Sequence, residues 1–196
     1  MDKKLKEKIS ILDPKFREKI GELLGTMEDS ISLLYEAATR DPKTGAYNSK
    51  FFENILDMEV AKAKRGQEKL SLFVVDIDFF KKINDKYGHL KADDLLIRLA
   101  KVLIKQFRKS DIVSRFGGEE FFILLPETNM VKAKKITARL RTAIKSDRIL
   151  KKHGVTISGG LTEFRKRDTK KAFKQRADKA LYKAKQTGRD RFVAVE

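Results

Sequence analysis

Apolar residues follow a helical period in the first part of the chain. Between residues 14 and 38 they recur every three or four positions, which is typical of an amphipathic helix or a short coiled-coil seam. These positions are Ile20, Leu24, Met27, Ile31 and Leu34. Asp13 and Pro14 suit the start of the helix, because aspartate caps a helix and proline fits its first turn. About two heptads are too few for a stable isolated coil. The helix either packs on its own domain or forms a stalk that pairs with a second copy or carries a signal, and we favour the stalk.

From residue 48 onwards, helix and strand patterns alternate. A nearly continuous apolar run over 70–77 predicts a strand buried on both faces. Gly117 and Gly118 separate two short apolar runs, which predicts a hairpin. The predicted elements in chain order are a helix over 48–65, a strand over 70–78, helices over 79–87 and 92–107, strands over 112–116 and 121–125, a helix over 130–145, a strand over 154–161, a helix over 169–186 and a strand over 191–195.

This order predicts an α/β fold with a mixed central sheet flanked by helices. Alternating strands and helices favour parallel neighbours, but a hairpin requires an antiparallel pair. A turn cluster over 41–45 separates the alternating region from the first helix. The sequence therefore predicts two parts, an N-terminal helical stalk over 1–40 and a domain over 41–196.

Composition limits the chemistry and the location that we expect. The chain has 196 residues and a net charge of +17, and most of the positive excess lies in residues 131–196. Such a concentration predicts a face that meets anions such as phosphates, although a lysine-rich solvated surface is the alternative. With no cysteine and two histidines, a disulfide framework, a thiolate metal site and a histidine-rich metal centre are excluded. No apolar run resembles a membrane span or a secretory signal, so we expect a cytoplasmic protein with no membrane partner.

Carboxylates gather at two places that a core would avoid. Asp76 and Asp78 end the apolar strand, and Glu119 and Glu120 follow the two glycines of the hairpin. If the strand lies beside the hairpin, Asp76 and one glutamate face each other, and the repulsion between them calls for a cation. Oxygen ligands favour Mg²⁺ over Zn²⁺. The alternative is that these are edge residues on a solvated turn.

Several segments together resemble the GGDEF domain family. The signature itself reads Arg-Phe-Gly-Gly-Glu-Glu-Phe over 115–121, with glutamate at the third position of the motif. Four more segments are similar to family motifs in the same order, namely 41–48, 76–89, 155–160 and 177–189. The resemblance covers about 41–196.

The resemblance implies an activity and a fold. The family's enzymes are diguanylate cyclases, which condense two GTP molecules into cyclic di-GMP and release two pyrophosphates, in a domain similar to nucleotidyl cyclases and the polymerase palm. It implies that a ribose 3′-hydroxyl attacks an α-phosphorus with the help of two metal ions per active site, Mg²⁺ or Mn²⁺. Because one site holds one GTP, it also implies a homodimer.

Matching positions assign roles to the acidic residues. The resemblance implies that Asp76, Glu119 and Glu120 hold the metal together with the backbone carbonyl of Ile77. It makes Glu119 the candidate proton acceptor and Glu120 a member of the same catalytic set. Lys81 would stabilise the charge that develops on the phosphates.

The resemblance also implies the substrate contacts. Asn84 and Asp93 would read guanine, because an amide both donates and accepts and a carboxylate accepts from N1–H and the N2 amine. Lys185 and Arg189 would reach the triphosphate. The remaining implied contacts are Phe80, Gly117 and Gly118.

A second site is implied for the product. Arg108 and Asp111 form an Arg-x-x-Asp pattern six residues ahead of Gly117, as in the family's product-inhibition site, and Arg139 resembles its secondary contact. Arginine pairs with phosphates and guanine, and aspartate accepts from guanine. A local Arg–Asp surface pair is the alternative.

Four positions depart from the family pattern. Lys43 and Ala46 replace leucines, Ala92 replaces a glycine, and Asp190 replaces an asparagine. None of these changes removes an implied metal, phosphate or base contact.

Three functions agree with these residues to different degrees. The leading hypothesis is an active, product-inhibited diguanylate cyclase that follows an upstream sensory domain. The second is a catalytically weak GGDEF domain that binds cyclic di-GMP or GTP. A basic nucleic-acid-binding protein is disfavoured, because the aromatic residues of the basic region fit a core better than an exposed stacking surface. These residues are Phe164, Phe173, Tyr182 and Phe192.

Overall fold

The first element is a long helix with an apolar row on its surface. The computed structural model of the chain describes residues 13–66 and 68–195, and it divides into two units, Met1–Thr39 and Arg40–Glu196. In the first unit, α2 (Pro14–Thr39) begins where the sequence predicted, and the Asp13 carboxylate accepts from the Lys15 amide at 2.9 Å. Residues 1–12 of the predicted stalk lie outside the described residues. Met27, Ile31 and Leu34 are more than half exposed on α2.

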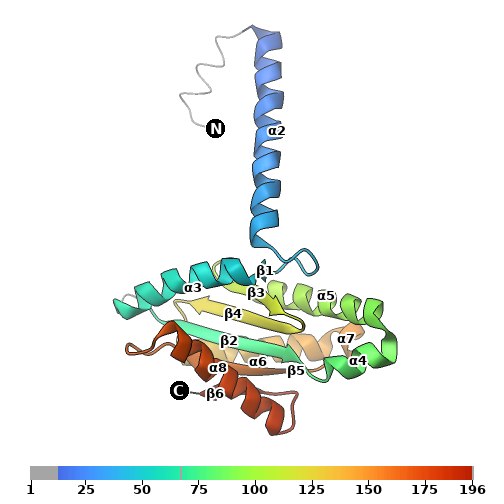
Figure 1. Ribbon diagram of the computed structural model, residues 1–196, viewed down its shortest axis with the longest axis vertical. Helices are drawn as coiled ribbons and strands as arrows, with labels where there is room; N and C mark the ends of the chain where they lie inside the picture. Colours follow the sequence, from blue (N-terminus) through green and yellow to red (C-terminus); the bar gives the residue numbers. More distant parts are fainter. Residues whose placement is uncertain (1–12, 67, 196) are drawn as a thin grey trace. The chain divides into compact units, whose positions relative to one another are not determined.

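The second unit is built on a mixed sheet, as the sequence predicted, and this sheet has six strands in the described residues (Figure 1). Its strands are β1 (Tyr47–Asn48), β2 (Leu70–Ile77), β3 (Ile112–Gly117), β4 (Glu120–Pro126), β5 (Ile157–Glu163) and β6 (Phe192–Val195). The order across the sheet is β1-β3-β4-β2-β5-β6. β2 is central and antiparallel to both β4 and β5, whereas β1 pairs parallel with β3 and β5 with β6.

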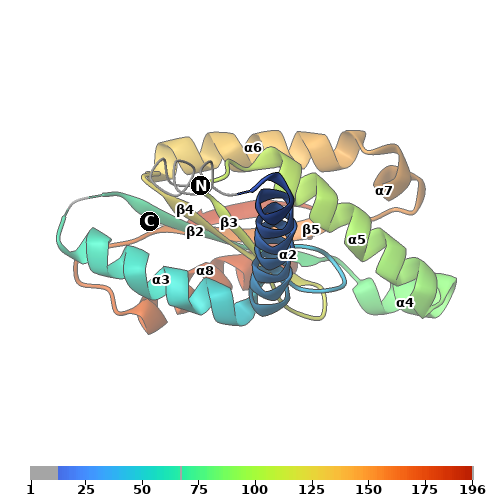
Figure 2. The same ribbon diagram turned by 90° about the horizontal axis from the view of Figure 1, so that it is seen from above.

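Helices cover both faces of this sheet. Figure 2 shows α3 (Ser49–Lys64) and α8 (Lys170–Gln186) along one face, and α5 (His89–Gln106) and α6 (Met130–Ser146) along the other. The short helices α4 (Phe80–Tyr87) and α7 (Arg148–Lys152) adjoin α5 and α6. Alternate residues of β2 serve the two cores: Leu72 and Val74 pack with α3 and α8, and Phe73 and Val75 pack with α5 and α6.

The helix α8 lies unusually close to the sheet at one position. A Cβ atom on Gly160 of β5 would lie 2.1 Å from the Ala177 carbonyl oxygen and 2.3 Å from the Leu181 amide nitrogen. Glycine is therefore required here so that the helix backbone can rest directly on the strand. This contact fixes where the end of α8, with Lys185, lies relative to the end of β2.

Several predicted elements are confirmed and others need correction. The Asn48 side chain caps α3 by accepting from the Phe51 amide, as predicted. The strand predicted over 154–161 instead occupies Ile157–Glu163, because its antiparallel partner β2 ends at Ile77, which pairs with Ile157. The elements α7 and β1 were not predicted, since five and two residues are too short for a periodic pattern.

One aromatic assignment was wrong. Tyr182 was predicted to be a core residue, but it is 62% exposed on α8 and its hydroxyl accepts from the Gln186 amide. The buried side of α8 carries Ala177, Leu181 and Ala184. Tyr182 follows Leu181 directly, so it is turned about 100° away from the sheet. Phe164 and Phe173 are buried as predicted.

None of the helices within residues 13–66 and 68–195 combines the length and the apolar character that a bilayer span requires.

Candidate active site

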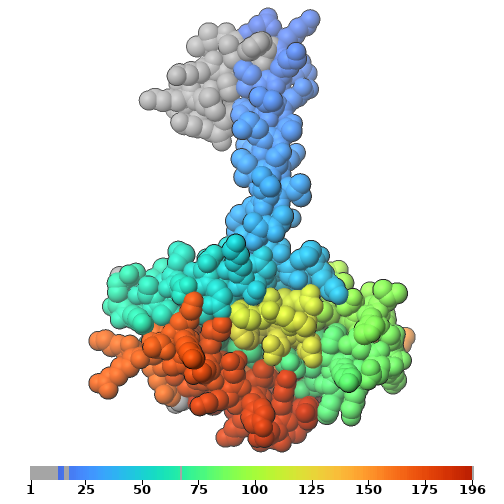
Figure 3. All heavy atoms as spheres, viewed as in Figure 1, coloured from blue at the N-terminus to red at the C-terminus, as the bar shows by residue number. Residues whose placement is uncertain are grey.

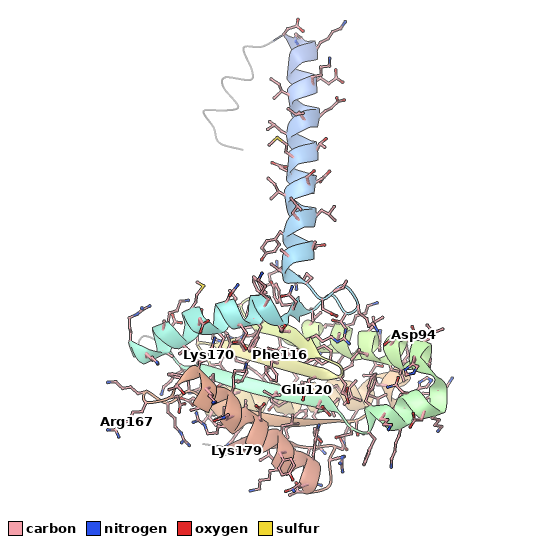
Figure 4. All side chains as sticks on the ribbon, in the orientation of Figure 1. Asp94, Phe116, Glu120, Arg167, Lys170 and Lys179 are labelled. Atoms are coloured by element: carbon pink, nitrogen blue, oxygen red, sulfur yellow. The ribbon has the colours of Figure 1, made fainter. Side chains whose placement is uncertain are left out.

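The register of the central strands brings acidic residues together. Asp76 of β2 pairs opposite Glu120 of β4, which is the juxtaposition that the sequence predicted. Asp76 is only 6% exposed, whereas Glu120 begins β4 at the surface and Glu119 is half-buried in the hairpin turn. Figure 4 labels Glu120 at this end of β4. The site thus lies where β2 ends and β4 begins.

These carboxylates affect one another electrostatically. Burial raises the pKa of the Asp76 carboxyl, the ion pair with Lys185 lowers it, and the nearby Glu119 and Asp78 raise it further. Burial also raises the pKa of Glu120, and the charge of Asp76 adds to the effect. Because the pKa values of Asp76 and Glu120 are both raised, the cluster resists full ionisation unless a positive partner is present.

A lysine supplies part of that positive charge. The Lys185 ammonium lies 2.8 Å from Asp76 Oδ1, and α8 carries it to the same face of the sheet. Asp178, also on α8, is a further acidic neighbour that raises the pKa of Glu120. Sequence reasoning assigned Asp178 no role, because an aspartate on the exposed face of a helix gives no signal of its own.

The donor atoms of the acidic set decide which metal ion it suits. Among the described residues, no group of three or more His, Cys, Asp or Glu side chains is arranged to hold a metal ion. Mg²⁺, however, is usually held by one or two carboxylates, and water and substrate phosphates complete its shell. Asp76 and Glu120, with Glu119 beside them and Ile77 at the end of β2, are a donor set of that kind. The residues present therefore fit a magnesium ion that shares its shell with a phosphorylated substrate.

Asp78 is close enough to raise the pKa of Asp76, but its carboxylate bonds to other elements. It is 4% exposed and accepts hydrogen bonds from Thr156 Oγ1 (2.8 Å), Ser158 Oγ (2.6 Å) and the Asp190 amide (3.0 Å). These bonds satisfy its buried charge. Asp78 thereby ties the end of β2 to β5 and to the turn after α8.

Basic residues surround the acidic cluster. Lys81 is exposed on the first turn of α4. The Arg189 guanidinium stacks 4.2 Å from the ring centre of Phe79, which has a left-handed backbone (φ 55°) just before α4. Lys82 also lies over that ring, at 4.6 Å. Sequence reasoning did not single out Phe79, although this stacking sets the position of Arg189.

The two implied base-reading residues lie on consecutive helices. Asn84 of α4 bonds to His89 Nδ1 at 3.1 Å and donates to the Phe80 carbonyl at 3.3 Å. Asp93, one turn into α5, forms an ion pair with Lys43 at 2.6 Å. The side chain of Phe80 is half-buried and packs against the core below α5.

An arginine joins the hairpin to the loop over 41–46. Arg115 donates to the Gly118 carbonyl at 2.8 and 3.0 Å and to both carboxylate oxygens of Asp41 at 3.2 Å. Gly118 has φ +48°, and a Cβ at Gly117 or Gly118 would meet nothing within 4 Å, so this turn is open to a ligand. Figure 3 shows the hairpin at the surface between this loop, the α4–α5 segment and the end of α8.

Comparison with known proteins assigns the family. The family model described as "Diguanylate cyclase, GGDEF domain" matches residues 38–191. The chain belongs to the GGDEF domain family. The diguanylate cyclase DgcP of Pseudomonas aeruginosa is 42% identical over 159 residues, which are 80% of this chain and 24% of that protein. The response regulator PleD of Caulobacter vibrioides is 37% identical over 164 residues, which are 81% of this chain and 36% of that protein. The chain thus spans well under half the length of these relatives.

Solved structures agree with this assignment. The coiled coil and GGDEF domain of DgcB from Caulobacter crescentus, solved in complex with c-di-GMP, covers 92% of this chain and is itself covered to 97%, with a TM-score of 0.79 at 27% identity. The diguanylate cyclase SiaD from Pseudomonas aeruginosa, solved with its activator SiaC, covers 92% of this chain and is covered to 71%, with a TM-score of 0.77 at 34% identity.

This GGDEF domain has a pocket at the opposite end of β3 from the acidic cluster. The pocket has a volume of about 370 Å³, and Arg108, Asp111 and Tyr47 are among the residues that line it. Asp111 is 5% exposed; its Oδ2 accepts from the Arg108 amide at 2.9 Å, and its Oδ1 has no partner among the described residues. Burial raises the pKa of Asp111. Arg139 donates to the Gln106 carbonyl at the end of α5, so it lies near the pocket without lining it.

Proposed function

We propose that the chain is a diguanylate cyclase that condenses two GTP molecules into cyclic di-GMP. The observation that carries the proposal is the pairing of Asp76 with Glu120 on adjacent strands, with Lys185 2.8 Å from Asp76. A buried carboxylate, a second carboxylate and a cation at one end of the central strands suit a divalent ion and a polyphosphate. The names of the relatives point to the same reaction.

In this proposal the acidic residues would hold the metal. Asp76, Glu119 and Glu120, with the carbonyl of Ile77, would bind two Mg²⁺ or Mn²⁺ ions. When bound, such ions stabilise the charge on attacking and leaving oxygens. Glu119, at the open hairpin turn, would accept the proton of the ribose 3′-hydroxyl. The new bond joins that oxygen to the α-phosphorus, and the bond to pyrophosphate breaks.

The basic residues would bind the triphosphate. Lys185 forms an ion pair with Asp76, so its ammonium is already held at the end of β2, where the phosphates would lie. Lys81 on α4 is exposed, so its side chain can turn toward the end of β2. Arg189 stacks on Phe79, the residue directly before α4, so its remaining donors lie near the start of the helix that carries Lys81. These cations would neutralise the charge that pyrophosphate carries away.

The substrate base and the second nucleotide set two further requirements. Asn84 and Asp93 would bind guanine from the ends of α4 and α5. Because one site binds one GTP, two copies must face each other so that each 3′-hydroxyl meets the other α-phosphorus. The apolar row on α2 would support this homodimer. The cytoplasmic location and the upstream sensory domain also stay predictions.

Product inhibition belongs to the same proposal. Arg108 and Asp111 meet in the pocket at the start of β3, and the unpartnered Oδ1 of Asp111 can accept from a guanine. Arg139 would add a phosphate contact. Cyclic di-GMP bound there would lie about 20 Å from the hairpin turn, since β3 rises about 3.3 Å per residue.

The proposal is tested with the purified chain, GTP and MgCl₂, and chromatographic analysis of the products. Cyclic di-GMP and pyrophosphate are expected in a ratio of one to two. Glu119→Gln should abolish turnover, whereas Glu127→Gln, the same change in the turn after the other end of β4, should leave it intact. A wild-type chain that binds GTP but yields no product would favour the receptor hypothesis, and unchanged turnover in Glu119→Gln would exclude the role given to that residue.

A further inference from the structure

Lys43 is placed beside a base-reading residue by a rigid loop. The Asp41 amide donates to the Ala46 carbonyl, and the Gly45 amide donates to the Asp41 carbonyl, so the loop over 41–46 is closed by reciprocal backbone bonds. Asp41 also accepts from Thr44 inside the loop and from Arg115, and the bond from Arg115 anchors the loop to the hairpin. Lys43 extends from this fixed loop.

The lysine reaches across the site to α5. Its ammonium lies 2.6 Å from Asp93 Oδ2, and the two side chains are 40% and 37% exposed, so a ligand can reach both. In the described part of the chain, this pair is the only side-chain interaction of Asp93, which leaves Oδ1 free to accept. A cationic donor and an anionic acceptor are thus held side by side at the proposed guanine site.

This arrangement is complementary to one edge of one purine. Guanine presents the O6 acceptor next to the N1–H donor, followed by the N2 amine. An ammonium bonded to a carboxylate presents a donor next to an acceptor at similar spacing. Adenine presents the reverse order, because its N6 amine is a donor and its N1 is an acceptor.

We propose that Lys43 is a specificity-determining residue that donates to guanine O6 while Asp93 accepts from N1–H and the N2 amine. The inference rests on the proposed function, in which Asp93 reads the base. Adenine in the same position would set its amine against the ammonium and its N1 lone pair against the carboxylate. Both contacts become repulsive, and the lost pairing is left without compensation. Leucine, which the family pattern has at this position, could not donate to O6.

The test separates base reading from turnover. Non-condensable α,β-methylene-GTP and α,β-methylene-ATP are titrated into the full chain by calorimetry in the presence of Mg²⁺. Lys43→Met removes the ammonium and its charge but keeps an unbranched side chain as long as the aliphatic part of lysine, and Lys43→Arg keeps a donor. The matched control is Lys91→Met, which removes the ammonium 3.6 Å from Asp94 on the same helix, outside the proposed site; Figure 4 labels Asp94.

Lys43→Met should weaken the guanine analogue about tenfold, the effect of one charge-assisted hydrogen bond at a partly exposed site. It should leave the adenine analogue unchanged or bound more tightly, while Lys43→Arg and Lys91→Met retain the guanine preference. In turnover, the variant should lose less kcat/KM for 6-thio-GTP, whose sulfur is a poor acceptor, than for GTP.

Three results overturn the inference. Unchanged or tighter binding of the guanine analogue by Lys43→Met, at an unchanged unfolding temperature, would mean that the ion pair is incidental or competes with the base. An equal loss for both analogues would mean that Lys43 acts through charge or folding alone. If the wild-type chain does not bind the guanine analogue, the proposed function fails together with the inference. If the wild-type chain binds it and either of the first two results is obtained, only the role given to Lys43 is rejected.

Discussion

Replacing Gly160 by alanine adds a single methyl group between β5 and α8. The added Cβ would lie 2.1 Å from the Ala177 carbonyl oxygen and 2.3 Å from the Leu181 amide nitrogen, whereas ordinary contacts begin at 3.4 Å. The helix would therefore have to move outward by about 1 Å. Because both obstructing atoms are backbone, no side-chain rotation relieves the clash, and we expect a loss of about 3 kcal/mol in the free energy of unfolding.

The same displacement should affect the site. Lys185 lies one turn beyond Leu181, and an outward movement of α8 would lengthen its 2.8 Å contact with Asp76. Urea unfolding followed by circular dichroism measures the stability change. With an m value of about 2 kcal/mol/M, the midpoint should fall by about 1.5 M. The rate of cyclic di-GMP formation should fall as well, at temperatures where the variant is fully folded.

Two other glycines provide the controls for this experiment. Gly25→Ala on α2 meets nothing within 4 Å and should not lower the midpoint, since alanine favours a helix. Gly159→Ala would meet ring atoms of Phe73 and Phe192 instead of helix backbone, so its loss should be smaller than that of Gly160→Ala, but because Phe73 is fully buried the midpoint should still fall. If Gly160→Ala unfolds at the wild-type midpoint, then α8 does not rest on β5 as described, and the reasoning about Lys185 fails with it.

Three further predictions concern other contacts. Asp168→Ala breaks a largely buried pair with Arg176 at 2.6 and 2.9 Å and should cost about 3 kcal/mol of unfolding free energy in urea titrations. Burial acts to raise the pKa of Asp168, but the hydrogen bonds from Arg176 outweigh it and hold that pKa below its ordinary value. The stability that the wild-type chain has over Asp168→Ala should therefore be complete above a pH of about 4 and should shrink as the pH falls further. A stability difference that is undiminished at a pH of about 2 would contradict this. Arg108→Ala should raise the cyclic di-GMP concentration that halves the initial rate by about tenfold, and inhibition that persists unchanged would refute the product site. The double substitution Met27→Glu and Leu34→Glu should lower the dimer fraction in analytical ultracentrifugation, and it should lower the rate of cyclic di-GMP formation per chain at low protein concentration. A wild-type chain that is monomeric and fully active would refute this expectation.

Local signals were sufficient for much of the fold. The start of α2 at Pro14, the cap at Asn48 and the buried run of β2 depend on neighbouring residues, so they could be predicted from the sequence. The opposition of Asp76 and Glu120 followed from placing a hairpin beside that strand. Conformations that long-range contacts decide could not be predicted. The start of β5 shifted because its first residue, Ile157, pairs with Ile77 at the end of β2, which is distant in the sequence.

The site was predictable to the extent that its residues carry unusual chemistry. Carboxylates at the end of an apolar strand stand out, but a lysine in a basic chain does not. Lys43 and Asp93 are 50 residues apart, and only the folded chain shows that they meet. Asp78 gave the same signal as Asp76, and only its three hydrogen bonds reveal that it supports the fold instead of facing the cluster.

The central position of β2 has a consequence for how the site moves. Asp76 belongs to a strand that is paired along both edges, and the amide protons of such a strand should exchange with solvent only when the whole domain opens. Lys81, Lys185 and Lys43 instead extend from two helices and a loop at the periphery. The backbone that carries Asp76 is therefore fixed, whereas the long side chains of these lysines can still change their torsion angles, so an incoming polyphosphate would meet a rigid strand end that carries the carboxylate and lysine side chains that can move toward it.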